Sequence, residues 1–251
     1  MKLTKFYWVL LLFPCLIFSG CKNKKGDDDI IIPALELYKQ GLTLLDKGKP
    51  TEAAAEFDKI FFQHPGDDIA PQAELMNAYS LFLATQYDEA VDVLDTFIKL
   101  HPMNVDIAYA HYLKALSYYM QISNIYLDQS RTALAKSSFE EVIKRFPNTR
   151  YAVDSALKID LVNDHLAGKE MEIGRGYLRQ NNPSAAINRF QNVIENYQTT
   201  SHTAEALYRL VVSYTALGLP EEAKKYAAVL GANYIDSHWY KYSYSLINKG
   251  M

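Results

Sequence analysis

The sequence predicts an all-α fold, a solenoid of about five helix pairs. A pattern of small and large apolar residues recurs five times between residues 34 and 235, at spacings that fit one face of a helix. Proline follows the pattern in the first three units and is a typical helix terminator. An apolar leader and a short polar segment precede the repeats.

The leader has the pattern of a signal peptide. Lys2 and Lys5 give it a positive start, and the apolar run that follows covers 13 residues, 6–18, interrupted by Pro14. A membrane-spanning helix needs roughly 20 apolar residues, so this run is too short for a stable one. We therefore expect a cleaved leader over residues 1–20.

The leader ends in Ser19-Gly20-Cys21, which resembles the lipobox of bacterial lipoproteins, although that motif usually has leucine where this chain has Phe18. The resemblance implies that Cys21 becomes the acylated first residue and anchors the chain to a membrane. Several acyl chains at about 0.8 kcal/mol per buried methylene make such an anchor effectively permanent. The alternative is a plain secretory peptide that is cleaved near Gly20.

Residues 21–33 are polar and charged, and we interpret them as a flexible tether. Loss of residues 1–20 removes two lysines and changes the formal net charge from −3 to −5. This negative charge argues against nucleic acid as a partner. By resemblance to lipoproteins of Gram-negative bacteria, Lys22 after the cysteine favours the outer membrane.

Each repeat unit contains two helices that pack on each other. The second helix starts from an alanine, followed four and seven residues later by larger apolar residues in nearly every unit. The alanines are Ala53, Ala90, Ala135, Ala186 and Ala223. The first helix carries a small residue where the two helices cross, except in the fifth unit, which has Val211. The small residues are Gly41, Ala78, Ala115 and Gly174.

This arrangement resembles the tetratricopeptide repeat. The boundaries that it implies are residues 34–147 for repeats 1–3 and 148–235 for repeats 4–5, ten helices in all. The third repeat has about eight extra residues, which predict an extended connection or a lengthened helix. The first helix of the fourth repeat should be long, and bent or frayed near Gly168, Gly174 and Gly176.

The C-terminal tail, residues 236–251, fits two structures. Trp239, Tyr242 and Leu246 have helical spacing, whereas Tyr240, Tyr242 and Tyr244 alternate as in a strand. The sequence leaves this choice open.

No catalytic motif is present, so we expect a scaffold without enzyme activity, cofactor or metal. The sequence lacks a Gly-x-Ser-x-Gly elbow, a phosphate-binding loop and a His-Glu-x-x-His motif. His64 and His101 recur one repeat apart, each directly before a proline, where a helix C-terminus favours histidine. We interpret them as structural rather than as metal ligands.

Six aromatic residues fall on or near the inner face of repeats 1–3, which is the binding face in arrays of this kind. They are Tyr38, Tyr79, Phe82, Tyr109, Tyr112 and Tyr119. Aromatic rings give an extended peptide a large contact area at little loss of rotamer freedom. The other interpretation is that these rings pack between neighbouring helices, as aromatic residues at helical spacing usually do.

The leader, tether and five repeats together resemble the BamD family of lipoproteins, which belongs to the machinery that inserts β-barrel proteins into the outer membrane. The resemblance implies that repeats 1–3 bind the C-terminal strands of unfolded barrel proteins. It also implies that repeats 4–5 dock the periplasmic domains of the insertase, with Arg189 on the docking side. The expected location is the outer membrane, lipid-anchored on the periplasmic face.

A second hypothesis comes from another class of protein. A lipid-anchored repeat protein of the envelope could instead bind cell-wall glycan or glycan that is being imported. Such importers are usually longer, with large insertions between repeats.

Overall fold

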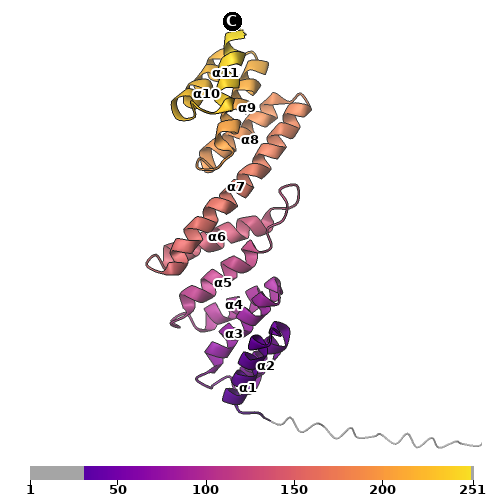
Figure 1. Cartoon of the computed structure of the whole chain (residues 1–251), viewed down its shortest axis with the longest axis vertical. Coiled ribbons are helices and arrows are strands. Elements are labelled where there is room, and N and C mark those ends of the chain that lie inside the picture. The colour runs from indigo at the N-terminus through magenta and orange to yellow at the C-terminus, as the bar shows by residue number, and fades with distance from the viewer. Residues whose placement is uncertain (1–30, 250–251) are drawn as a thin grey trace, which may run out of the picture. The chain divides into compact units, whose positions relative to one another are not determined.

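The computed structural model describes residues 31–249, and the helices within this range follow one another from α1 to α11 (Figure 1). The helices are α1 (Ala34–Asp46), α2 (Pro50–Gln63), α3 (Ala70–Leu83), α4 (Tyr87–Leu100), α5 (Ile107–Tyr119), α6 (Ser130–Arg145), α7 (Arg150–Arg179), α8 (Pro183–Asn196), α9 (Thr203–Ala216), α10 (Pro220–Asn233) and α11 (His238–Lys249). Each helix packs on the next, as in a tetratricopeptide-repeat solenoid. None of these helices combines the length and apolar character that a membrane span requires.

In the first and fourth repeats the two helices of a pair cross where a glycine faces a large ring. A Cβ atom added to Gly41 on α1 would lie 2.6 Å from the ring of Phe57 on α2. At Gly174 on α7 the corresponding distance to the ring of Phe190 on α8 is 2.4 Å. Both rings are fully buried, so the glycines of the repeat pattern are required by close packing rather than by backbone conformation.

Four of the five pairs are joined by a tight turn that contains one residue with positive φ. These residues are Gly48, Thr85, Asn181 and Gly218. The pair α5–α6 instead has a connection over residues 120–129, so the extra residues of the third repeat form an extended connection.

The long helix α7 runs continuously through all three of its glycines. Its first half packs with Tyr118 and Phe139 in one buried cluster, and its second half packs with Phe190 in another. The prediction of a long helix is confirmed, and its backbone is helical throughout rather than frayed near the glycines. Helix α7 therefore belongs to the cores of both halves of the solenoid (Figure 1).

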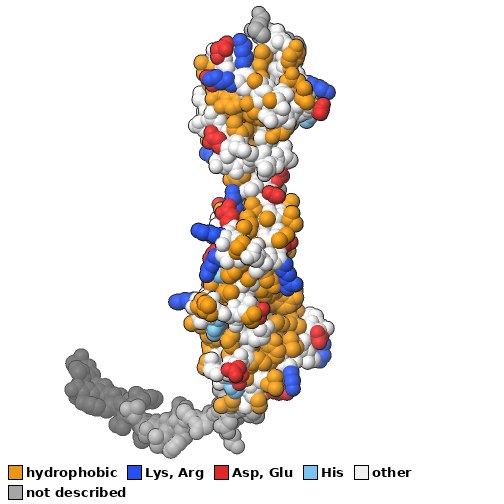
Figure 2. All heavy atoms as spheres, turned by 90° about the vertical axis from the view of Figure 1, so that its left-hand side faces the viewer, with side chains coloured by type: hydrophobic (Ala, Val, Ile, Leu, Met, Phe, Trp, Pro, Cys, Tyr) orange, Lys and Arg blue, Asp and Glu red, His pale blue; other side chains and the backbone are white. Residues whose placement is uncertain are grey.

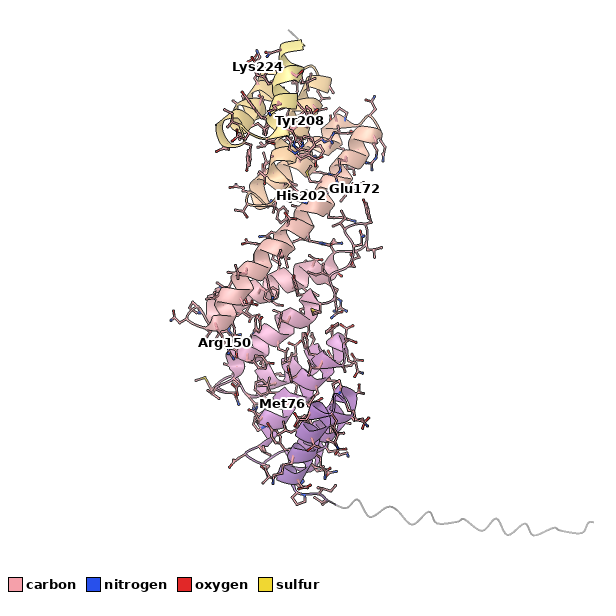
Figure 3. The ribbon with its side chains drawn as sticks, viewed as in Figure 1. Met76, Arg150, Glu172, His202, Tyr208 and Lys224 are labelled. Carbon is pink, nitrogen blue, oxygen red and sulfur yellow. The ribbon has the colours of Figure 1, made fainter. Side chains whose placement is uncertain are left out.

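Two connections lie against the middle of α7. Asp164 accepts hydrogen bonds from the backbone N–H and the hydroxyl of Ser201, at 2.9 and 2.7 Å. The ring of His202 lies beside Gly168 (Figure 3). From the other connection, the carbonyl of Leu127 accepts a hydrogen bond from Lys169 Nζ at 3.2 Å.

The ten helices predicted for the five repeats are α1 to α10, and the tail, which the sequence left undecided, forms an eleventh helix, α11. Trp239 and Tyr242 are three positions apart on one face of α11, and both pack on Tyr208 of α9, with ring centroids 5.3 and 6.0 Å away. The tail therefore forms a helix, with the spacing of Trp239 and Tyr242, and not a strand with alternating tyrosines. The aromatic face of α11 thus covers the end of the last repeat.

Substitutions at two glycines of α7 should have opposite effects on stability. Gly174→Ala is expected to lower the free energy of unfolding by about 1–3 kcal/mol, because its Cβ would overlap the Phe190 ring. Gly176→Ala should raise it by up to about 1 kcal/mol, because alanine is the better helix former and the nearest neighbouring atom is the flexible Arg179 Nη2 at 3.8 Å. Urea unfolding followed by circular dichroism measures both, and equal effects would contradict the close crossing.

Candidate functional site

The six predicted aromatic residues all lie on the first helix of a pair and are all half-buried. Tyr38 lies on α1, Tyr79 and Phe82 on α3, and the remaining three on α5. Each ring therefore has one part in contact with its neighbours and another part open to solvent. In the space-filling view, hydrophobic side chains form a broad face over the N-terminal helices, with charged groups mainly at its margins (Figure 2).

In the first two repeats the rings pack against the second helix of their own pair. Tyr38 meets Phe57 edge to face, with centroids 5.4 Å apart, and Phe82 meets Tyr87 at 5.5 Å. Tyr79, Phe82 and Tyr109 pack on the buried cluster of α3, α4 and α5. The expected packing between helices is thus present, and the exposed parts of the rings remain available to a ligand.

A tyrosine from α7 joins the rings of α5 into one group. Tyr151 lies 5.6 Å from Tyr109 and 5.2 Å from Tyr112, measured between ring centroids. The hydroxyl of Tyr112 donates a hydrogen bond to Oδ2 of Asp154. Sequence reasoning missed Tyr151 and Asp154, and the signal that could have indicated them was their place in the first turns of the long fourth-repeat helix.

The hydroxyls of Tyr109 and Tyr112 stay protonated at neutral pH. Burial, with a smaller contribution from nearby Tyr79, raises the pKa of Tyr109 to about 12. Burial and the hydrogen bond to Asp154 also raise the pKa of Tyr112. Neutral hydroxyls beside apolar rings suit contact with a polypeptide that carries both polar backbone and aromatic side chains.

Tyr119 has a different environment from the other five. Its ring meets Phe139 at 6.0 Å, and Lys158 Nζ lies 5.4 Å from the ring centroid. The structure therefore brings Tyr109 and Tyr112 together through Tyr151. Tyr112 also lies 6.3 Å from Phe139, the ring that Tyr119 contacts, whereas Tyr38 packs on Phe57.

Arg189 lies on α8, in the half predicted for docking. Its guanidinium forms an ion pair with Glu170 of α7 at 3.2 Å, and its side chain is 41% exposed, compared with 18% for Glu170. Tyr177 and Asn192 line the same hollow, of about 280 Å³. The guanidinium is therefore held in place by one carboxylate while its outer side remains open to a second.

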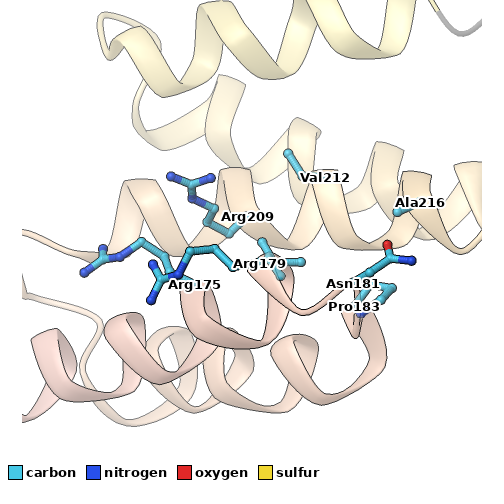
Figure 4. Close-up of a pocket in the computed structure, with 8 residues that line it drawn as sticks. Arg175, Arg179, Asn181, Pro183, Arg209, Val212 and Ala216 are labelled. Atoms are coloured by element: carbon cyan, nitrogen blue, oxygen red, sulfur yellow. The ribbon is translucent and has the colours of Figure 1, made fainter.

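Three further arginines line a neighbouring cavity of about 470 Å³ between α7 and α9 (Figure 4). Arg175 pairs with Glu172 at 3.0 Å and with Glu205 at 3.3 Å, while Arg179 and Arg209 each pair with one of these glutamates. The three arginines and two glutamates give this cluster a net charge of +1. Helical spacing on α7 could have indicated Glu172, Arg175 and Arg179, but Arg209 comes from another helix.

The two histidines that precede prolines lie at helix C-termini, where the sequence placed them. His64 and His101 are the C-terminal caps of α2 and α4. Among residues 31–249, no three His, Cys, Asp or Glu side chains are grouped so that they could hold a metal ion. Cys21, the predicted acylation site, lies outside the described residues.

Comparisons with known proteins identify relatives over nearly the whole chain. The family described as YfiO, outer membrane lipoprotein, matches residues 32–230. The outer membrane protein assembly factor BamD of Rickettsia prowazekii is 65% identical over 247 residues, which cover 98% of each chain. The protein of the same name from Caulobacter vibrioides is 45% identical, over 92% of this chain and 76% of its own.

A solved tetratricopeptide-repeat protein from Thermus thermophilus is 15% identical, with a TM-score of 0.40 over 86% of this chain and 98% of its own. The relatives by sequence confirm the resemblance to BamD-type lipoproteins. On this evidence the chain belongs to the YfiO family of outer membrane lipoproteins.

Proposed function

We propose that this chain is a scaffold that takes part in the assembly and insertion of β-barrel proteins in the outer membrane. The observation that carries the proposal is the 65% identity, over 98% of both chains, to a protein named outer membrane protein assembly factor BamD. The alternative function, binding of glycan at the envelope, has no support from these relatives.

The scaffold acts by binding rather than by catalysis. Its half-exposed aromatic rings and its arginine-lined hollows suit peptide and carboxylate partners. These surfaces are open hollows between helices, whereas catalysis needs a nucleophile, a base and a means of excluding water at one place.

Repeats 1–3 bind the C-terminal strand of an unfolded barrel protein. The group of Tyr109, Tyr112 and Tyr151 supports this role, because it offers three ring surfaces and two neutral hydroxyls within a short distance. An extended strand that ends in an aromatic residue would gain ring contacts there, each contributing on the order of 1 kcal/mol beyond the area that it buries.

Repeats 4–5 dock the periplasmic domains of the insertase, with Arg189 as a contact. An arginine that is already oriented by Glu170 loses little freedom when it meets a second carboxylate. The ion pair itself is partly exposed and contributes only about 0.2–1 kcal/mol to folding. The side chain is therefore better suited to binding than to stability.

Arg189→Glu is expected to abolish co-purification of the insertase from detergent-solubilised outer membrane. The new carboxylate would repel the acidic group on the insertase that the arginine is proposed to bind. Photo-crosslinking of a C-terminal barrel peptide to the same variant should be retained. A variant that still brings the insertase with it in wild-type amount would contradict the docking role.

Glu170→Gln is the matched control, since it breaks the same ion pair but keeps the arginine. It should leave insertase binding intact, and loss in both variants would mean that the ion pair acts only by stabilising the fold.

Tyr79→Ala, in repeats 1–3, should weaken peptide crosslinking and leave insertase binding unchanged. Its circular dichroism spectrum separates lost binding from lost folding.

The chain is anchored through acyl groups on Cys21 and lies on the periplasmic face of the outer membrane. The family description, outer membrane lipoprotein, supports the anchor. Cys21→Ser should abolish palmitate labelling and release the chain from membranes, because serine cannot form the thioether. Continued firm fractionation with membranes would contradict the anchor.

A further inference from the structure

A small acidic hollow lies between α2, α3 and α4, and its lining contains none of the aromatic or arginine residues discussed above. It measures about 190 Å³, and three carboxylates line it, from Asp58, Glu74 and Asp92. The apolar part of the lining comes from Phe61, Phe62 and Val93. Phe62 is 72% exposed, so much of its ring is free to meet a ligand.

None of the three carboxylates forms an ion pair with a lysine or arginine of residues 31–249. Asp58 accepts one hydrogen bond, from Nδ2 of Asn77 at 3.2 Å. Glu74 lies beside His101, whose Nε2 is 3.2 Å from Oε2. Elsewhere the chain does pair such groups, as Glu172 and Glu205 show.

Glu74 is the residue that most needs a further partner. Its side chain is only 4% exposed, and Oε1 has no hydrogen-bond partner although it is buried. A buried carboxylate oxygen without a partner lowers stability unless a cation or donor approaches it. Burial raises the pKa of Glu74, although nearby His101 offsets part of this effect, and burial also raises the pKa of Asp58.

The lining selects among cations. Within the described range no three acidic, histidine or cysteine side chains converge as metal ligands do. A planar guanidinium, in contrast, donates to separate carboxylates through its fork and stacks on an aromatic face. An ammonium group concentrates its charge at one point and stacks less well.

We propose that this hollow receives an arginine side chain from a partner protein, with the guanidinium between Asp58 and Asp92 above Glu74 and against the ring of Phe62. The segment that carries the arginine also has an apolar neighbour, which covers Val93 and the remaining face of Phe62. The surface thus binds a basic, apolar segment, which goes beyond the aromatic-strand and insertase surfaces of the proposed function.

The test uses the full chain in detergent and two fluorescein-labelled peptides, Gly-Val-Arg-Phe-Gly and its citrulline analogue, with fluorescence anisotropy as the readout. Citrulline keeps the shape of arginine without its charge. The arginine peptide should bind at least about tenfold more tightly, which corresponds to about 1.4 kcal/mol. Equal affinity of the two peptides would overturn the proposal.

Asp58→Asn combined with Asp92→Asn should bring the affinity for the arginine peptide down to that for the citrulline peptide. Glu140→Gln is the matched control, because Glu140 is exposed on α6 and has no ion pair within residues 31–249. It should change the affinity less than twofold. Equal weakening by the control, or equally effective competition by spermidine, would show a general cation effect and overturn the proposal.

Discussion

The close crossing within each helix pair is the constraint on which the structure depends. A ring or large aliphatic side chain on the second helix presses against a small residue on the first, as Phe57 does against Gly41 and Phe190 against Gly174. In the second repeat the small residue is Ala78 and the large one is Leu94, and both belong to one buried cluster. A repeat cannot bury its apolar face alone, so each crossing also sets how the pair meets its neighbours.

The binding surfaces follow from this arrangement. The crossings bury the second-helix rings, whereas the six aromatic residues described above, on the first helices of repeats 1–3, are half-exposed. Helix α7 then connects this part of the solenoid to the arginine-lined hollows, since it contributes to the buried clusters of both. An aromatic surface for peptide and a basic surface for docking can thus occupy different repeats of one continuous structure.

The sequence predicts most of the fold because helical spacing is local. The alanine anchors and the prolines indicated the paired helices, and the long α7 followed from the stretch before Gly174. The tail could not be decided, because Tyr242 fits both spacings and only its contact with Tyr208 selects the helix. The candidate site was harder to predict than the fold, since Tyr112 and Asp154 are 42 residues apart and no local pattern connects them. The acidic hollow likewise draws its carboxylates from three separate helices.

A double-mutant cycle on Gly174→Ala and Phe190→Leu tests the crossing most directly. Leucine opposite alanine is the pairing that the second repeat uses, so the smaller side chain should relieve the overlap that the added methyl group creates. The double variant is expected to be more stable than the sum of the single effects predicts, by about 1 kcal/mol or more. Single effects that simply add, to within about 0.5 kcal/mol, would contradict the claim that small and large residues are matched across the pairs of repeats 1–4.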